Sequence, residues 1–151
     1  MKSHNHKVVP PVYVLVAILA ILLLHFGLPG PVIIPKPWNL LGILFILLGL
    51  AAPVLAVMTF RRAHTSPEPF HEPAALVTGG IYAISRNPIY LGFLLVQLGL
   101  VILLRTLVPL VVLVGYIVLI ERNVIRLEEG MLAEKFGAQW LEYKKRTRRW
   151  L

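Results

Sequence analysis

The stretch from Trp38 to Phe60 contains no charged residue, and it limits the possible folds of this chain more than any other feature. As an α-helix it extends roughly 35 Å, enough to cross the hydrocarbon core of a bilayer, which is about 30 Å thick. Backbone polar groups find no water inside a bilayer, so an isolated spanning segment has to be helical. We therefore expect a transmembrane helix here.

The composition of the whole chain agrees with a membrane protein. Apolar residues make up 58% of the 151 residues, charged residues make up 15%, and the mean hydropathy is +0.78. Soluble domains carry about 25% charged residues, so a soluble globular domain is excluded, as are disordered and collagen-like chains. The chain has no cysteine, which excludes disulfides, thiolate metal sites and a nucleophilic thiol.

Three further apolar segments accompany the first. They run over Val12–Leu28, Pro88–Leu104 and Leu107–Ile120. No small-residue cleavage pattern follows Leu28, so we expect the earliest segment to be retained rather than removed as a signal peptide. The last segment is too short to cross a bilayer, and we expect its helix to continue past Glu121.

The sequence thus predicts an all-α fold, a polytopic membrane bundle of about four transmembrane helices followed by C-terminal amphipathic helices. We treat 1–151 as a single domain, with an N-terminal two-helix hairpin in 1–60 and the motif-bearing region in 61–151. The glycines of the second and third apolar segments predict close packing of helices rather than ligand binding. These glycines are Gly42, Gly49, Gly92 and Gly99.

Lysine and arginine are distributed unevenly between the two sides of such a bundle. One side carries Lys36 and Arg105, whereas the other carries both ends of the chain and the second loop, with Lys2, Lys7, Arg61, Arg62, Arg86 and the basic C-terminus. The positive-inside rule makes the richer side cytoplasmic. We expect an integral protein of a bacterial-type inner membrane with both termini in the cytoplasm. The net charge of +8 suits anionic lipid rather than nucleic acid.

The third apolar segment opens with Asn87 and Pro88, directly after Arg86. Asparagine is a strong N-cap and proline is favoured at the first helical position. A helix N-terminus beside an arginine can bind a carboxylate or a phosphate. The alternative is that Arg86 only anchors the chain at the cytoplasmic surface and that Asn87 only caps the helix.

A second group of candidate residues follows the fourth apolar segment. On a helical wheel, the acidic residues Glu121, Glu128 and Glu129 lie close to the apolar stripe, together with Arg122, whereas Glu134 lies opposite. The stripe is formed by Ile125, Leu132 and Phe136. Ionisable groups that face inward at a membrane are costly and point to a function. The alternative is a structural ion pair, for example between Arg126 and Glu129.

The C-terminal segment alternates aromatic and basic residues, including Trp140, Tyr143 and Trp150. This pattern is typical of an interfacial anchor that contacts anionic lipid. The nucleotide-binding glycine patterns and the H-E-x-x-H zinc motif are absent from the sequence. The histidines have no carboxylate ladder around them, so we expect no metal site.

The two groups of candidate residues together resemble the isoprenylcysteine carboxyl methyltransferase and phospholipid methyltransferase family. The motifs that carry the resemblance are Thr78-x-Gly80-x-Tyr82, Arg86-Asn87-Pro88-x-Tyr90-x-Gly92, Glu128-Glu129-x-x-Leu132-x-x-x-Phe136-Gly137 and Tyr143. The resemblance implies an integral-membrane enzyme that uses S-adenosylmethionine and yields S-adenosylhomocysteine. The cofactor pocket that it implies is lined by Tyr82, Arg86, Asn87, Tyr90, Glu128 and Glu129.

The chemistry of these side chains agrees with that cofactor. Arg86 can bind its carboxylate, Glu128 or Glu129 its ammonium, and an aromatic ring its sulfonium by cation–π attraction. A carboxylate acceptor is already ionised, whereas an amine acceptor needs a base, for which Glu121 and Glu128 are the candidates. The expected catalytic set is therefore Arg86, Glu121 and Glu128.

The expected acceptor is a lipophilic small molecule or a lipidated substrate, as in isoprenylcysteine carboxyl methylation. It would reach the site from the membrane lipid, between helices. Two alternatives stay open: N-methylation of a phospholipid amine, and a non-catalytic membrane protein that binds lipid or a partner.

Overall fold

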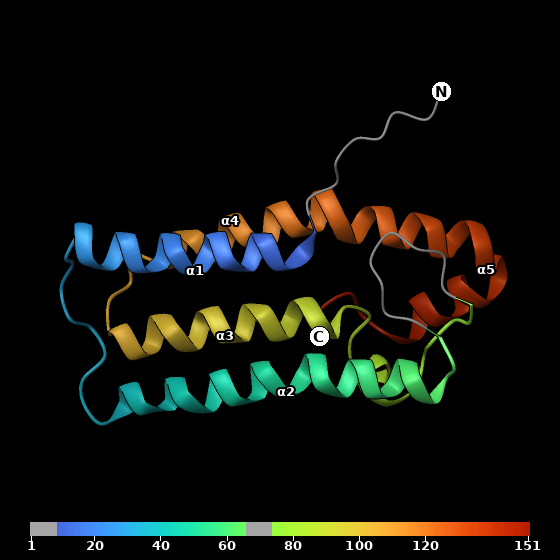
Figure 1. Ribbon diagram of the computed structural model, residues 1–151, viewed down its shortest axis with the longest axis horizontal. Helices are drawn as coiled ribbons and strands as arrows, with labels where there is room; N and C mark the ends of the chain where they lie inside the picture. Colours follow the sequence, from blue (N-terminus) through green and yellow to red (C-terminus); the bar gives the residue numbers. More distant parts are fainter. Residues whose placement is uncertain (1–8, 66–73) are drawn as a thin grey trace.

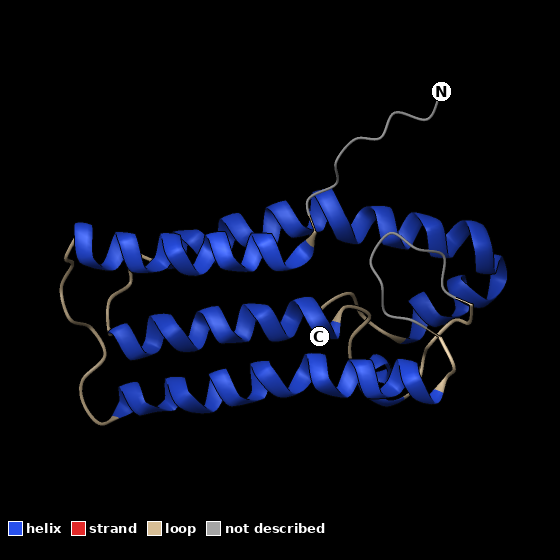
Figure 2. Cartoon of the chain, in the orientation of Figure 1, coloured by secondary structure: helices blue, strands red, loops and turns tan. Residues whose placement is uncertain are grey.

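The helices of the structure follow the apolar segments of the sequence. The computed structural model describes residues 9–65 and 74–151, and every regular element within these ranges is helical (Figure 2). The long elements are α1 (Pro10–Gly27), α2 (Leu41–Arg62), α3 (Pro88–Leu104), α4 (Leu110–Ile120) and α5 (Arg126–Arg146). Short 3₁₀ turns precede α2 at Trp38–Leu40 and α3 at Gly80–Ala83. The predicted all-α fold is confirmed for the described residues.

Helix α3 lies at the centre of the bundle, with α2 on one side and the pair of α1 and α4 on the other (Figure 1). The connections from α1 to α2 and from α3 to α4 lie at one end. At the opposite end α5 extends beyond the bundle and turns back, and the chain then returns to the start of α3, where Arg86 N donates to Arg148 O at 3.0 Å. The candidate site residues belong to this end.

Two helices of the described ranges are long and apolar enough to cross a membrane. These are α1, with 18 residues and a mean hydropathy of 2.2, and α2 with its preceding turn, with 25 residues and a mean hydropathy of 2.8. Their outward surfaces are apolar, as the exposed side chains of Leu23 and Leu47 illustrate. Helix α3 has 17 residues and α4 has 11, so both are shorter. The lysines at positions 2 and 7, used above to orient the chain, lie outside the described residues.

Helices α2 and α3 pack with their backbones in contact. A Cβ atom added to Gly49 would lie 2.6 Å from the carbonyl oxygen of Gly92, and one added to Gly92 would lie 2.6 Å from that of Gly49. Gly42 and Gly99 face each other in the same way. Glycine at both sides of the contact is what allows this approach. The prediction that these glycines serve helix packing is confirmed.

The fourth apolar segment becomes helical later than expected. Arg105, with φ of 67°, ends α3 in the left-handed conformation, and Pro109 occupies the N-cap of α4. The helix therefore begins at Leu110 rather than Leu107.

Its continuation past Glu121 is confirmed, because α4 runs through a π-helical turn over Glu121–Ile125 directly into α5. A π turn holds one residue more than an α turn. It therefore rotates the residues before it by roughly 100° relative to those after it. As a result Arg122 is exposed, whereas the wheel placed it on the inward face; Glu121, Glu128 and Glu129 do lie inward, and Glu134 is exposed as expected.

Two of the three C-terminal aromatic residues predicted to contact lipid are buried in the structure. Helix α5 bends at Gly137, whose φ of 46° and ψ of −115° suit glycine. The bend turns the second half of α5 back toward the bundle (Figure 1). Trp140 and Tyr143 are each only 3% exposed and pack inside the protein. The anchoring interpretation is wrong for these two rings, because the bend at Gly137 directs them into the protein instead of toward lipid.

Candidate active site

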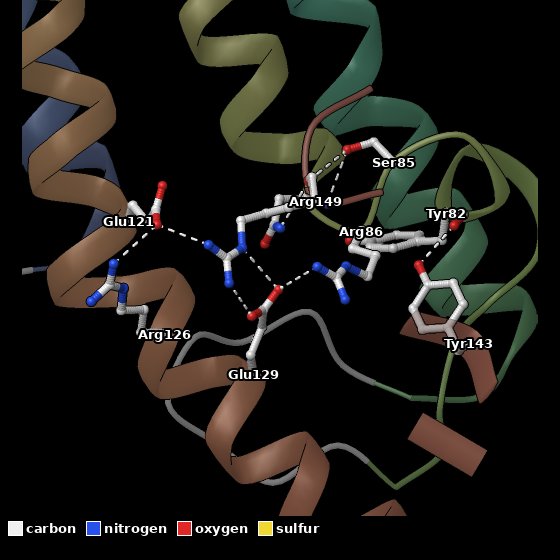
Figure 3. A network of polar contacts seen from close by, with 9 residues as sticks. Tyr82, Ser85, Arg86, Glu121, Arg126, Glu129, Tyr143 and Arg149 are labelled. Carbon is white, nitrogen blue, oxygen red and sulfur yellow. Dashed lines mark hydrogen bonds and ion pairs between the residues drawn. The ribbon is translucent and has the colours of Figure 1, made fainter. Parts of the chain in front are cut away.

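The candidate site forms where the N-terminus of α3, the junction of α4 with α5 and the returning C-terminal segment meet. Figure 3 shows Arg86 from the start of α3, Glu121 and Glu129 from the α4–α5 junction and Arg149 from the C-terminal segment pointing toward one another. Segments distant in sequence thus supply opposite charges to one small volume.

Glu129 accepts contacts from two arginines. Arg149 binds it with two nitrogens, Nη2 at 2.7 Å from Oε2 and Nε at 3.2 Å from Oε1. Arg86 reaches it with one nitrogen, Nη2 at 3.1 Å from Oε1. The Glu129 side chain is 12% exposed, so its charge is balanced by guanidinium groups in place of water.

Glu121 lies at the other side of Arg149. Its Oε1 atom accepts Arg149 Nη1 at 2.8 Å and Arg126 Nη2 at 3.3 Å. The sequence suggested Arg126 with Glu129 as the alternative ion pair. In the structure Arg126 pairs with Glu121 instead, across the π turn, where these two side chains are five residues apart.

Arg86 is the most deeply buried charged side chain of this cluster. It is 6% exposed, and its Nε and Nη1 atoms have no hydrogen-bond partner among the described residues. The guanidinium carbon lies 5.5 Å from the centroid of the Trp140 ring. Buried donors without a partner are uncommon and costly, so this edge of Arg86 is suited to an anionic ligand.

Asn87 occupies the N-cap of α3, as expected, but its side chain does not cap the helix with a hydrogen bond. Its Nδ2 donates to Arg149 O at 3.0 Å, and Ser85 Oγ donates to the same carbonyl at 3.2 Å. Ser85 Oγ also accepts the Asn87 N–H at 3.1 Å. Asn87 is thus the N-cap residue as predicted, but its amide binds the returning C-terminal segment instead of the helix backbone.

Glu128 is separate from the arginine cluster. Its Oε1 accepts the Tyr90 hydroxyl at 2.8 Å. Burial raises the pKa of Glu128 from 4.5 to about 7, and the hydrogen bond from Tyr90 opposes part of that rise. This carboxyl group can therefore both lose and accept a proton near neutral pH.

Tyr82 lies next to these groups in the turn before α3. Burial, followed by the charge of Glu128, raises its pKa above the ordinary value. Its carbonyl accepts the Tyr143 hydroxyl at 2.7 Å, and its ring packs edge-on against Phe60 at 5.3 Å between centroids. The hydroxyl of Tyr143 thus holds the 3₁₀ turn against α5.

All the sequence-predicted site residues come to this end of the bundle, in two sets. Arg86, Glu121 and Glu129 belong to the ionic cluster, whereas Tyr82, Tyr90 and Glu128 belong to the second set. Asn87 is linked to the ionic cluster through the carbonyl oxygen of Arg149. Sequence reasoning missed Arg149, which belongs to a run of basic residues whose other members, such as Arg148, are exposed.

Comparison with known proteins gives the family. The model of the phospholipid methyltransferase family matches residues 38–139, about two thirds of the chain. The chain belongs to the phospholipid methyltransferase family. The matched range contains every sequence-predicted site residue, whereas Arg149 lies beyond it.

Curated relatives of this family member include three protein-S-isoprenylcysteine O-methyltransferases. That of Saccharomyces cerevisiae is 32% identical over 114 residues, which are 74% of this chain and 48% of the relative. The A and B enzymes of Arabidopsis thaliana are 32% and 31% identical and cover 68% and 70% of this chain, or 53% and 55% of the relatives. The chain thus spans about half the length of the curated relatives that it matches. No solved structure matches it.

A groove of about 350 Å³ follows the seam between α1 and α4 in this family member. Its lining is apolar and includes the small residues Ala17, Ala20 and Gly115. At its base Tyr116 is buried, with its hydroxyl 3.5 Å from Tyr90 O. Tyr13, also in the lining, accepts a hydrogen bond from Asn123 of the π turn at 3.2 Å. Through Tyr116 the groove therefore adjoins the backbone of α3 at Tyr90, although its lining contains none of the sequence-predicted site residues.

Proposed function

We propose that this protein transfers a methyl group from S-adenosylmethionine to a lipophilic acceptor at the membrane. The observation that carries the proposal is the buried guanidinium of Arg86, which contacts Glu129 and has two donor atoms that lack partners among the described residues, while the neighbouring Glu128 provides a second carboxyl group at the same end of the bundle. A ligand with a carboxylate and an ammonium group a few ångströms apart would satisfy both charges. Membership of a methyltransferase family supports the same ligand.

The residues present fit this cofactor. The Nε–Nη1 edge of Arg86 would bind its carboxylate, and Glu128, whose Oε1 accepts the Tyr90 hydroxyl, would bind its ammonium. The rings of Tyr82 and Tyr90 would line the pocket beside the sulfonium. When bound, S-adenosylmethionine supplies an activated methyl group. Glu129 and Asn87 then contribute as lining residues that hold Arg86 and the C-terminal segment in place.

The acceptor would enter from the lipid phase along the groove between α1 and α4. An apolar groove without charged residues favours an acyl or isoprenoid chain over a polar molecule. Its polar end would then lie near Tyr90 and Glu128. For a carboxyl acceptor this chain has only to align and desolvate the group, as for a carboxyl methyltransferase similar to the isoprenylcysteine enzymes.

A phospholipid amine is the second candidate acceptor, favoured by one observation. Glu128 has a pKa of about 7, as a base for an ammonium group near neutral pH requires. Glu121 is the less suitable base, because its Oε1 already accepts two arginines.

We infer that all four apolar helices cross the membrane, with both termini in the cytoplasm of a bacterial-type inner membrane. As a helix, α3 extends roughly 26 Å, and α4 with the π turn roughly 24 Å. Both are slightly shorter than the hydrocarbon core of about 30 Å, as expected if the polar site at their ends lies at the edge of the membrane. Reporter fusions at residue 70 and at the C-terminus should both report a cytoplasmic position; an external position for either would overturn this topology.

One experiment tests the proposed function. The detergent-purified protein is incubated with methyl-labelled S-adenosylmethionine and a membrane-lipid extract, and the labelled products are separated and identified. Label in a lipid or lipidated peptide supports methyl transfer, and base-stable or base-labile label distinguishes amine from ester products. Cofactor binding without transfer, or lipid binding alone, would favour the non-catalytic alternative. Activity that a chelator abolishes and one metal restores would contradict the mechanism.

A further inference from the structure

Arg86 and Arg149 both contact the carboxylate of Glu129. The way they share its two oxygens determines which donors of Arg86 stay available for a ligand. A guanidinium group binds a carboxylate most strongly through two parallel N–H donors to both oxygens. Arg149 makes this two-point contact with Glu129, through Nη2 and Nε. Arg86 is left with a single contact through Nη2, and its Nε–Nη1 edge stays without a partner among the described residues.

We propose that Arg149 is a positioning residue: by occupying both oxygens of Glu129, it keeps the Nε–Nη1 edge of Arg86 available for the carboxylate of the ligand. This inference rests on the proposed function and adds a residue to the site. In the absence of Arg149, the Arg86 guanidinium would rotate onto Glu129 with two donors. The ligand would then have to displace an internal ion pair.

Arg149 is held on both sides, as a positioning role requires. Its Nη1 atom contacts Glu121 Oε1 at 2.8 Å. Its carbonyl oxygen accepts Ser85 Oγ and Asn87 Nδ2, both at the start of α3. Arg148, its neighbour, accepts the Arg86 N–H with its backbone carbonyl, and its side chain is exposed. The adjacent arginines therefore differ in what their side chains do, which supplies a matched control.

The test compares two ligands that differ in the carboxylate alone. Dissociation constants for S-adenosylmethionine and for its decarboxylated form are measured with the wild-type protein, Arg149→Gln and Arg148→Gln. We expect Arg149→Gln to weaken S-adenosylmethionine binding about 10- to 100-fold, as for loss of a charge-assisted hydrogen bond. Binding of the decarboxylated form should change by less than about threefold, since that ligand makes no use of the Arg86 edge. Arg148→Gln should resemble the wild type with both ligands.

A second variant separates positioning from folding. Arg149→Lys keeps the positive charge between Glu121 and Glu129 but cannot bind both oxygens of Glu129 through a planar fork. Its melting temperature without ligand should stay close to the wild-type value, while the preference for the carboxylate-bearing ligand falls. Equal losses for both ligands, or no loss in either variant, would overturn the positioning role. A wild-type protein that binds neither ligand would instead overturn the proposed function itself.

Discussion

Each end of α3 carries an arginine, and the two side chains have different surroundings. Arg105 follows the last residue of α3; its Nε donates to Ile34 O at 2.8 Å, and its carbonyl accepts Ile33 N–H at 2.9 Å. Arg86, near the first residue, is almost fully buried and has two donors without a partner among the described residues. Arg105 thus connects the α1–α2 loop to the end of α3 by hydrogen bonds and has a structural role. Arg86, the candidate ligand-binding arginine, has donors that the described residues do not use.

The largest expected effect separates these two arginines. Arg86→Ala should weaken S-adenosylmethionine binding at least ~100-fold, because two charge-assisted hydrogen bonds are lost together. Arg105→Ala should leave that affinity unchanged and lower the melting temperature, since only the contact with the Ile34 carbonyl is lost. Both quantities are measured on the same detergent preparations. Normal affinity and a lower melting temperature for Arg86→Ala would show that Arg86 stabilises the fold and does not bind the ligand.

A smaller effect is expected at the acidic partners. Glu128→Gln should weaken S-adenosylmethionine binding by about 10- to 100-fold, because an amide cannot pair with the ammonium group by charge. The amide oxygen can still accept the Tyr90 hydroxyl, so the fold should persist. Glu134→Gln, at an exposed position of the same helix, is the control and should bind normally. Glu129→Gln should act through Arg86 and Arg149, with a loss of both affinity and thermal stability.

The groove provides a test that leaves the cofactor untouched. Gly115 lines the groove, and no atom lies within 4 Å of a Cβ added there. A leucine at this position should therefore extend into the groove: Gly115→Leu should raise the KM for a lipophilic acceptor several-fold, while the affinity for S-adenosylmethionine stays the same. Val114→Leu, on the exposed side of α4, should change neither. An unaltered acceptor KM in Gly115→Leu would place the acceptor elsewhere.

The smallest effect is a pH dependence that has opposite signs for stability and for binding. The folded protein retains a proton on Glu128 up to a pKa of about 7, whereas the unfolded chain releases it near 4.5. Stability from this group is therefore present below pH 4.5 and is lost as the pH rises toward 7. S-adenosylmethionine needs the ionised form, so its affinity should increase over the same interval. Melting curves and titrations between pH 5 and 8 measure both, and Glu128→Gln should remove both trends.

The sequence was most informative where one local rule decides the structure. Blocks such as Trp38–Phe60 have to be helical in lipid, and Asn87 with Pro88 marks the start of α3 to the residue. The pairing of glycines between α2 and α3 follows from the absence of side chains. In each case a few neighbouring residues suffice for the prediction.

The rest depends on contacts between segments that are distant in the chain. The π turn rotates Arg122 outward, and no residue type within Glu121–Ile125 predicts a π turn. The bend at Gly137 returns the C-terminal segment to α3, which converts Arg149 from one basic residue in a run to a member of the site. The different surroundings of Glu128 and Glu129 likewise come from Tyr90 and Arg149, not from their own positions in the sequence.

The close contact of α2 with α3 also bears on how the bundle can move. Where Gly49 meets Gly92, backbone lies against backbone, and no side chain can change its rotamer to let the helices slide or separate. The two helices should therefore behave as one rigid body. Widening of the bundle to exchange a lipid chain is then confined to the opposite seam, between α1 and α4, where the apolar groove lies. The helices would thus move, and lipid would enter, on the side of α3 that faces α1 and α4. The rigid pair of α2 and α3 would keep Arg86, at the start of α3, in a constant position.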